Sequence, residues 1–90
     1  MHSGRNDIIN TWAVLDYECR DGNHVCIAPG CVLSGNVVVG DNVHIGTGST
    51  VIQGIHIGEG TLVGAGSVVV KDIAGQSKAY GVPARVVGRL

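Results

Sequence analysis

The stretch from Val25 to Val70, VCIAPGCVLSGNVVVGDNVHIGTGSTVIQGIHIGEGTLVGAGSVVV, decides the fold because the same residue types recur in it every six positions. Each hexad contains one aliphatic residue at a fixed place, and this column extends back to Ile9. Its members are Ile9, Leu15, Asp21, Ile27, Leu33, Val39, Ile45, Val51, Ile57, Val63 and Val69. Only Asp21 is not aliphatic. A period of six sustained over the chain indicates a repeat architecture rather than an amphipathic helix.

Two further columns keep the same spacing. A small or medium residue stands two positions before each aliphatic residue, and a Gly or Asn stands three positions after most of them. The second of these columns contains Gly30, Asn36, Asn42, Gly48, Gly54, Gly60 and Gly66. Gly and Asn tolerate the left-handed backbone conformation that a tight corner requires. Each hexad therefore predicts a short strand with its aliphatic side chain inward, followed by a corner.

Three hexads close a triangular coil of eighteen residues, so residues eighteen apart stack at a spacing of about 4.8 Å. We predict an all-β protein, a parallel β-helix with three to four triangular coils over residues 8–72. A polar lead-in at residues 1–7 precedes it, and a C-terminal loop and cap at 73–90 follow it. The spacing does not determine handedness, since general crossover sterics favour right-handed connections.

Composition excludes several classes of function. The net charge of -1 offers no basic surface for nucleic acid, and no apolar run is long enough to span a bilayer. Cys19, Cys26 and Cys31 form no C-x-x-C pair, and their odd number argues against a disulfide framework. We expect reduced thiols and a cytoplasmic protein that binds neither nucleic acid nor membrane.

The short chain of 90 residues also limits how much apolar surface it buries on its own. The inward column alone offsets little of the conformational entropy that ordering the coils costs. We therefore expect an obligate oligomer.

Three segments resemble the left-handed β-helix acyltransferases: NTWAVLDYEC at 10–19, the hexads from Asn23 to Asp72, and GVPAR at 81–85. Within that group the chain is most similar to the sialic acid O-acetyltransferases and UDP-amino-sugar N-acetyltransferases, over about residues 8–87. The resemblance implies left-handed coils, a homotrimer, and acetyl-CoA as cosubstrate in grooves between neighbouring chains. It further implies a small-molecule acceptor such as an amino sugar or nucleotide sugar, and we expect no metal.

The resemblance also assigns catalytic positions. The family's base histidine falls on Tyr17, which Glu18 follows, and Gly35 matches a residue whose backbone amide faces the acetyl carbonyl as an oxyanion donor. A neutral imidazole accepts a proton near pH 7, whereas a phenol with a pKa of about 10 is a poor base. We expect acetyl transfer to be weak or redirected.

Cofactor-binding positions follow in the same way. A family histidine that contacts acyl-CoA falls on Cys26, and Thr47 and Ala65 match residues that line the pantetheine groove. Lys71 and Arg85 either meet phosphate groups or are ordinary solvated charges. Family members carry a nucleotide-sugar domain before the β-helix, and this chain begins where that domain would end, so acceptor specificity would need another chain.

A truncated, non-catalytic trimeric scaffold module is the alternative function, because Tyr17 and Cys26 replace two family histidines. In that interpretation Tyr17 fills space between subunits and Glu18 is a solvated corner. Asp21 is a separate problem, since an unpaired carboxylate is costly at an inward position. Either it pairs with Arg20 or a neighbouring chain, or the first coil is distorted.

The histidines allow two other hypotheses. Cys26 and His44 lie eighteen apart and should stack on the outside of the coils, where a Cys–His nucleophile pair is conceivable. His44 and His56 differ by twelve positions and should lie on different sides of the triangle, so a zinc site would have to form between chains. His24 stands where the corner column has Gly or Asn.

Overall fold

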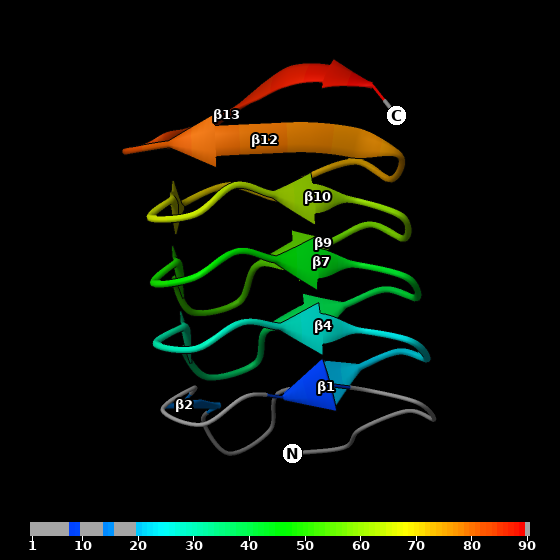
Figure 1. Cartoon of the computed structure of the whole chain (residues 1–90), viewed down its shortest axis with the longest axis vertical. Coiled ribbons are helices and arrows are strands. Elements are labelled where there is room, and N and C mark those ends of the chain that lie inside the picture. Colours follow the sequence, from blue (N-terminus) through cyan, green and yellow to red (C-terminus); the bar gives the residue numbers. More distant parts are fainter. Residues whose placement is uncertain (1–7, 10–13, 16–19, 90) are drawn as a thin grey trace.

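The chain forms a parallel β-helix whose computed structural model describes residues 8–9, 14–15 and 20–89 (Figure 1). Strands of two residues turn successively through three sides of a triangle. Face I contains β1 (Ile8–Ile9), β4 (Cys26–Ile27), β7 (His44–Ile45), β10 (Leu62–Val63), β12 (Ser77–Gly81) and β13 (Ala84–Arg89). Face II contains β2 (Val14–Leu15), β5 (Val32–Leu33), β8 (Thr50–Val51) and β11 (Val68–Val69). Face III contains β3 (Arg20–Asp21), β6 (Val38–Val39) and β9 (His56–Ile57).

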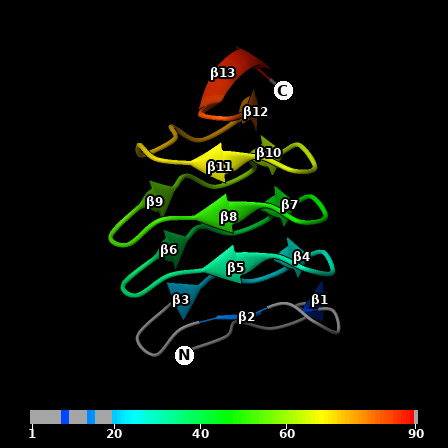
Figure 2. The same ribbon diagram turned by 90° about the vertical axis from the view of Figure 1, so that its left-hand side faces the viewer.

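The coils wind in the left-handed sense. In Figure 1 the face I strands β4, β7 and β10 run from right to left across the front while the chain climbs from the N-terminus to the C-terminus. Figure 2 shows the next strands, β5, β8 and β11, running from right to left over the adjoining side. The predicted fold class, an all-β left-handed helix of hexapeptide repeats, is confirmed.

Main-chain hydrogen bonds join coils with the predicted spacing of eighteen. Cys26 pairs with His44 and Ile27 with Ile45 in parallel register. The N–H of Cys26 donates to the carbonyl of Val43 at 2.9 Å, one residue before its register partner. The same pattern recurs on all three faces, so each regular coil satisfies the backbone of the one before it.

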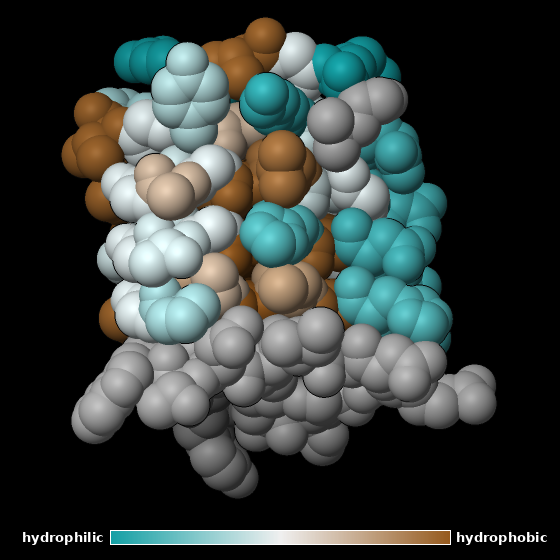
Figure 3. Space-filling view, in the orientation of Figure 1, coloured by the Kyte–Doolittle hydropathy of each residue, from teal (hydrophilic) through white to brown (hydrophobic). Residues whose placement is uncertain are grey.

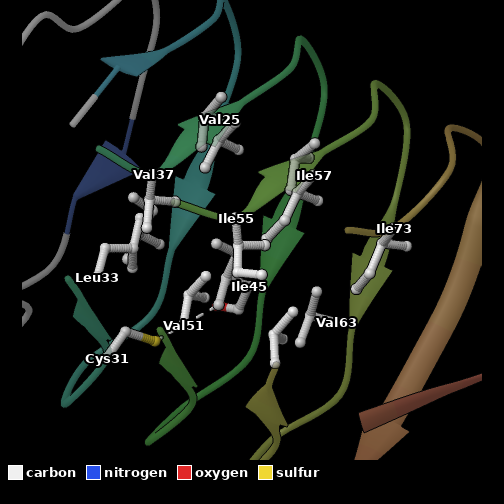
Figure 4. Close-up of a cluster of buried hydrophobic side chains, with 14 of the residues drawn as sticks. Val25, Cys31, Leu33, Val37, Ile45, Val51, Ile55, Ile57, Val63 and Ile73 are labelled. Atoms are coloured by element: carbon white, nitrogen blue, oxygen red, sulfur yellow. Dashed lines mark hydrogen bonds between the residues drawn. The ribbon is translucent and has the colours of Figure 1, made fainter. Parts of the chain in front are cut away.

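The inward columns form one continuous core (Figure 4). From Ile27 to Val69 every member of the aliphatic column is at most 2% exposed. The polar members of the other inward column are also buried, and their hydroxyl groups donate to corner carbonyls. Ser49 Oγ donates to the Gly64 carbonyl at 3.0 Å, and Thr61 Oγ1 donates to the Ala74 carbonyl at 3.1 Å. The hydroxyls are thus buried without losing their hydrogen bonds.

Cys31 occupies the same inward column one coil before Ser49. Its Sγ donates to the Gly46 carbonyl at 3.1 Å, as Ser49 Oγ does to Gly64 eighteen residues later. Burial raises the pKa of the Cys31 thiol, because the thiolate would lose its hydration. The side chain therefore acts as a small apolar residue with one donor.

The corners have the conformation that the sequence predicts. The residues with positive φ include His24, Gly30, Asn36, Asn42, Gly48, Gly54, Gly60 and Gly66. His24, at a φ of 58°, adopts the conformation of the Gly or Asn that it replaces. We name the corners by the faces they join: corner I–II holds residues 28–30, 46–48 and 64–66, corner II–III holds 34–36, 52–54 and 70–72, and corner III–I holds 22–24, 40–42 and 58–60.

The first residue of each corner distinguishes corner II–III from the other two. A Cβ built on Gly46 in corner I–II would lie 2.6 Å from the backbone N of Ala65, and one on Gly40 in corner III–I would lie 2.7 Å from the N of Glu59. Gly40 and Gly46 therefore leave no room for a side chain, while the equivalent position in the first corner I–II is the small residue Ala28. Corner II–III has Ser34, Ile52 and Val70 instead, of which Ile52 and Val70 are exposed.

The last coil is two residues shorter than the others. Ile73 bridges to Ile57 and Ala79 pairs with Val63, which are both sixteen residues earlier. Asp72 Oδ1 accepts a hydrogen bond from the N–H of His56 at 2.9 Å, a donor that a main-chain carbonyl satisfies in the regular coils. The core thus continues to Ala79, beyond the repeat boundary that the sequence suggests at residue 72.

An antiparallel hairpin covers the C-terminal end of the coils (Figure 1), where the sequence predicts a loop and a cap or short strand. β12 extends face I, and β13 pairs with it. Near the other end, Arg20 and Asp21 pair in regular register with Val38 and Val39, so the backbone is not distorted at these two residues. None of the described residues forms a helix of the length and apolarity that crossing a membrane requires.

Candidate functional site

The predicted site residues divide between two edges of the molecule. Thr47 and Ala65 lie in corner I–II and are exposed, and Cys26 lies half-buried on the neighbouring face I. Gly35 and Lys71 lie in corner II–III, the next corner along the chain. Tyr17 and Glu18 lie outside the described residues.

Corner I–II is a narrow column of small residues. The carbonyl of Thr47 accepts a hydrogen bond from the N–H of Gly66 at 2.8 Å, and the carbonyl of Pro29 accepts one from Gly48 at 3.0 Å. With Gly46 and Gly64 beside them, Thr47 and Ala65 leave little side-chain bulk along this edge. Such an edge allows a linear ligand to approach the backbone closely.

In corner II–III, Gly35 is half-buried. Its carbonyl accepts a hydrogen bond from the N–H of Gly54 at 3.0 Å, while its own N–H donates to no backbone acceptor in the described part of the chain. Lys71, two coils further on, is exposed in the same corner.

Face II separates these two groups of residues. Corner I–II precedes the strands of face II and corner II–III follows them, so the two groups lie at opposite ends of this face. One chain therefore does not bring Gly35 and Lys71 together with Thr47 and Ala65. A site that uses both groups needs a second chain at one of these edges.

The surface of face II is apolar, which the sequence analysis did not identify. Val32, Ile52 and Val70 are 37%, 39% and 36% exposed, and Thr50 and Val68 between them are half-buried. The sequence contained a signal for this strip at the first residue of each corner. That residue is glycine or alanine in the other two corners, but it is Ser34, Ile52 or Val70 in corner II–III. A strip of this kind is typical of a protein interface.

Figure 3 looks onto face I, where polar residues gather along the right-hand edge, over corner III–I. They include Asn23, His24, Asp41, Asn42 and Glu59. Asp41 Oδ1 accepts a hydrogen bond from the N–H of Asn23 at 2.7 Å, so this carboxylate helps to hold the corner. This side of the molecule is the more hydrophilic edge of face I.

Cys26 and His44 are neighbours in register on the outside of face I, as their spacing predicts. His44 on β7 and His56 on β9 lie on different faces, also as predicted. Among the described residues, no three His, Cys, Asp or Glu side chains are placed to hold a metal ion together. Cys26 and His44 thus lie side by side on adjacent strands, and we assign no role to the pair.

Arg85 lies on β13, directly opposite Tyr80 on β12, and both are exposed. The hairpin thus places Arg85 at the end of face I, near the column that contains Ala65. Arg85 was a candidate through the GVPAR segment at 81–85, whereas Tyr80 lies between that segment and the last hexad and belongs to neither pattern.

Comparison with known proteins agrees with this architecture. The family model of the bacterial transferase hexapeptide, with six repeats, matches residues 22–53 and 36–71. Among curated protein sequences, none matches the chain significantly.

Several solved structures are similar to the chain. Serine acetyltransferase from Neisseria gonorrhoeae is 32% identical over 98% of this chain, with a TM-score of 0.94. A histidine variant of perosamine N-acetyltransferase from Caulobacter crescentus, solved in complex with CoA and GDP-perosamine, is 45% identical over 96%, with a TM-score of 0.93. The acetyltransferase domain of PglB from Neisseria gonorrhoeae is 40% identical over 90%, with a TM-score of 0.89.

The chain spans only 38%, 42% and 40% of the lengths of these three structures, so the likeness concerns their β-helical part. It has the fold of acetyltransferases that have been solved with CoA bound. Its hexads match the family model over more than half of its length. The chain belongs to the bacterial transferase hexapeptide family.

Proposed function

We propose that the chain is the acyl-CoA-binding β-helix of an acetyltransferase that acts as a homotrimer in the cytoplasm. One observation carries the proposal: Gly35 and Lys71 lie at one edge of the apolar face II, and Thr47 and Ala65 lie at the other. Packing such faces between chains would bring one edge of a chain to the opposite edge of its neighbour. The cosubstrate groove would then form between chains.

Each residue has a role in this groove. The small residues Thr47 and Ala65 admit the pantetheine arm, and Cys26 contacts the acyl-CoA from face I. Lys71 and Arg85 attract its phosphate groups. The N–H of Gly35 stabilises the oxyanion that develops when an acceptor attacks the thioester carbonyl.

The acceptor that we propose is an amino sugar carried on a nucleotide. The Caulobacter crescentus relative, which was solved with GDP-perosamine, supports this chemical class. Tyr17 replaces the histidine base and is followed by the acidic residue Glu18, so proton removal from the acceptor is the weak step. We also propose the cytoplasm as the location, because the free thiols of Cys26 and Cys31 suit a reducing compartment.

Calorimetric titration with acetyl-CoA, with the mass of the particle measured by light scattering in the same buffer, tests the proposal. We expect saturable binding near one site per chain in a trimer. Ile52→Asp should give monomers that no longer bind acetyl-CoA, because a charge on the face II strip opposes its burial. His56→Asp places a charge on the exposed side of face III and is the matched control that should change neither property.

A non-catalytic trimeric scaffold is the second candidate, favoured by the replacement of two family histidines by Tyr17 and Cys26. A trimer that folds well but does not bind acetyl-CoA would support it. Tyr17→His distinguishes the two further, because restoring an imidazole should raise acetyl transfer or acetyl-CoA hydrolysis in a chain whose groove is intact. A variant that binds acetyl-CoA without any gain in rate would contradict the lost-base explanation.

A further inference from the structure

The β12–β13 hairpin carries a combination of exposed side chains that differs from the rest of the described surface. Tyr80 is 54% exposed, and Lys78, Arg85 and Arg89 are exposed on the same two strands. Residues 73–89 contain no Asp or Glu, whereas corner III–I of the regular coils contains Asp41 and Glu59. The hairpin therefore presents an aromatic ring in a positive local field.

Strand geometry places this ring between two of the cations. Ser77 and Ala79 point inward, at 3% and 0% exposure, so Lys78 and Tyr80 point outward on the same side of β12. Arg85 is the direct antiparallel partner of Tyr80. Directly opposed residues have Cβ atoms about 4.5–5.5 Å apart, so Arg85 flanks the ring from β13 while Lys78 flanks it along β12.

This group continues the candidate groove rather than standing apart from it. A Cβ built on Gly64 would lie 2.7 Å from the Cβ of Tyr80, so Tyr80 lies directly above the residue that precedes Ala65. On face I, Cys26, His44, Leu62 and Lys78 follow one another in register. Three steps of about 4.8 Å separate Cys26 from the hairpin by about 14 Å. An extended pantetheine arm whose thioester lies near Cys26 would end at this level.

We propose that Tyr80, Lys78 and Arg85 form a nucleotide-binding platform, on which the base of acyl-CoA stacks against the Tyr80 ring and its phosphates lie against the two cations. The inference rests on the proposed acyl-CoA function and assigns the residues that bind the nucleotide half of the cosubstrate. Every nucleobase has a π-face, so a stacking contact suits the base while the charges suit the phosphates. The platform raises affinity without touching the thioester.

Two ligands with the same thioester and arm test the proposal by calorimetry. Acetyl-CoA contains the nucleotide, whereas S-acetyl-4′-phosphopantetheine lacks the whole adenosine 3′,5′-bisphosphate part. Tyr80→Ala should weaken acetyl-CoA binding about 5- to 150-fold, the range that one base–aromatic stack supports, and leave S-acetyl-phosphopantetheine binding unchanged. Tyr80→Phe should keep the wild-type affinity for both ligands. Val82→Ala, on an exposed residue of the same hairpin, is the matched control.

Arg85→Gln tests the electrostatic part. It should weaken binding of adenosine 3′,5′-bisphosphate and flatten the fall of that affinity with salt, because one cation–phosphate attraction is removed. Thermal unfolding of each variant checks that the hairpin still folds.

The possible outcomes separate the two hypotheses. If the wild-type trimer binds neither thioester, the proposed function and the platform both fail. Should acetyl-CoA bind equally well to wild type and Tyr80→Ala, or should Tyr80→Ala weaken both thioesters equally, the platform is overturned and the groove stands. If Tyr80→Ala weakens binding of GDP or UDP but not of acetyl-CoA, the platform belongs to a nucleotide-sugar acceptor and its assignment to acyl-CoA is wrong.

Discussion

In the middle of the β-helix a coil takes eighteen residues, whereas the last coil takes sixteen and closes with a hairpin. In the middle coils, main-chain bonds between corresponding positions repeat from one coil to the next. In the last coil, Asp72 supplies a side-chain acceptor to His56, and Ser67 Oγ accepts a hydrogen bond from the N–H of Gly81 at 3.1 Å. The backbone ladder of the interior coils thus follows from regular spacing, while at the end of the stack side chains supply acceptors for backbone donors.

The largest effect that we expect concerns backbone shape in the middle coils. Gly46→Ala should lower the free energy of unfolding by about 1–3 kcal/mol or more, the cost of overpacking, because its Cβ would lie 2.6 Å from the N of Ala65. Gly48→Ala meets nothing within 4 Å but has a φ of 72°, so only the left-handed penalty of about 1–2 kcal/mol applies. Urea unfolding of both variants measures the difference. Equal losses would mean that the close approach of the coils is not the reason for glycine at position 46.

The attachment of the hairpin to the last coil provides the second prediction. Ser67→Ala removes both the acceptor for Gly81 N–H and the donor to the Gly64 carbonyl at 2.7 Å. We expect a loss of about 1–3 kcal/mol, because a buried polar group loses its partner. Hydrogen exchange should quicken at Gly81 before it quickens in the coils. Uniform acceleration over the whole chain would show that the hairpin is not a separate unit of opening.

Asp72 allows a smaller and more local prediction. Asp72→Ala should cost about 0.5–1.5 kcal/mol and speed hydrogen exchange at the amide of His56, which loses its acceptor. Asp72→Asn keeps a side-chain oxygen in the same place and is the matched control. If both variants exchange at the same rate as the wild type, the carboxylate does not replace the missing main-chain acceptor.

The smallest effect is a change of stability with pH at Cys31. Burial raises the pKa of the folded thiol, so the folded protein keeps this proton at a pH at which the unfolded chain, with a thiol pKa of about 8.5, begins to lose it. The stabilisation is fully present below about pH 8.5 and is lost as the pH rises through the raised pKa. Cys31→Ser, which can donate to Gly46 as Ser49 does to Gly64, should flatten this alkaline slope. Parallel curves of unfolding free energy against pH would contradict the expectation.

The fold was largely predictable because each element depends on local spacing. At His24, local spacing decides the backbone conformation even against residue type, since the histidine adopts the positive φ of the Gly and Asn residues in the same column. The position of Ile73 was not predictable in this way, because no pattern in residues 70–80 indicates that the last coil is two residues shorter. In the shortened coil, Asp72 satisfies a donor on β9 that a main-chain carbonyl satisfies elsewhere.

The candidate site was less predictable than the fold. The register of Cys26 with His44 followed from their separation, since a regular coil converts sequence distance into stacking. Residues Tyr80 and Arg85 meet through a hairpin and a shortened coil, and neither obeys the spacing of eighteen. The apolar strip on face II was also missed, because inward periodicity draws attention away from outward residues such as Ile52.

By itself the sequence determined the period, the inward columns, the positive-φ corners and the stacking of residues eighteen apart, because each of these depends on steric preferences within one hexad. Only the tertiary structure decided that Tyr80 stands above Gly64 between two cations, and that Asp72 accepts a hydrogen bond from His56. These relations depend on how the chain closes its last coil and folds back. That closure is the joint result of hydrogen bonds between residues on different coils, which no single repeat contains.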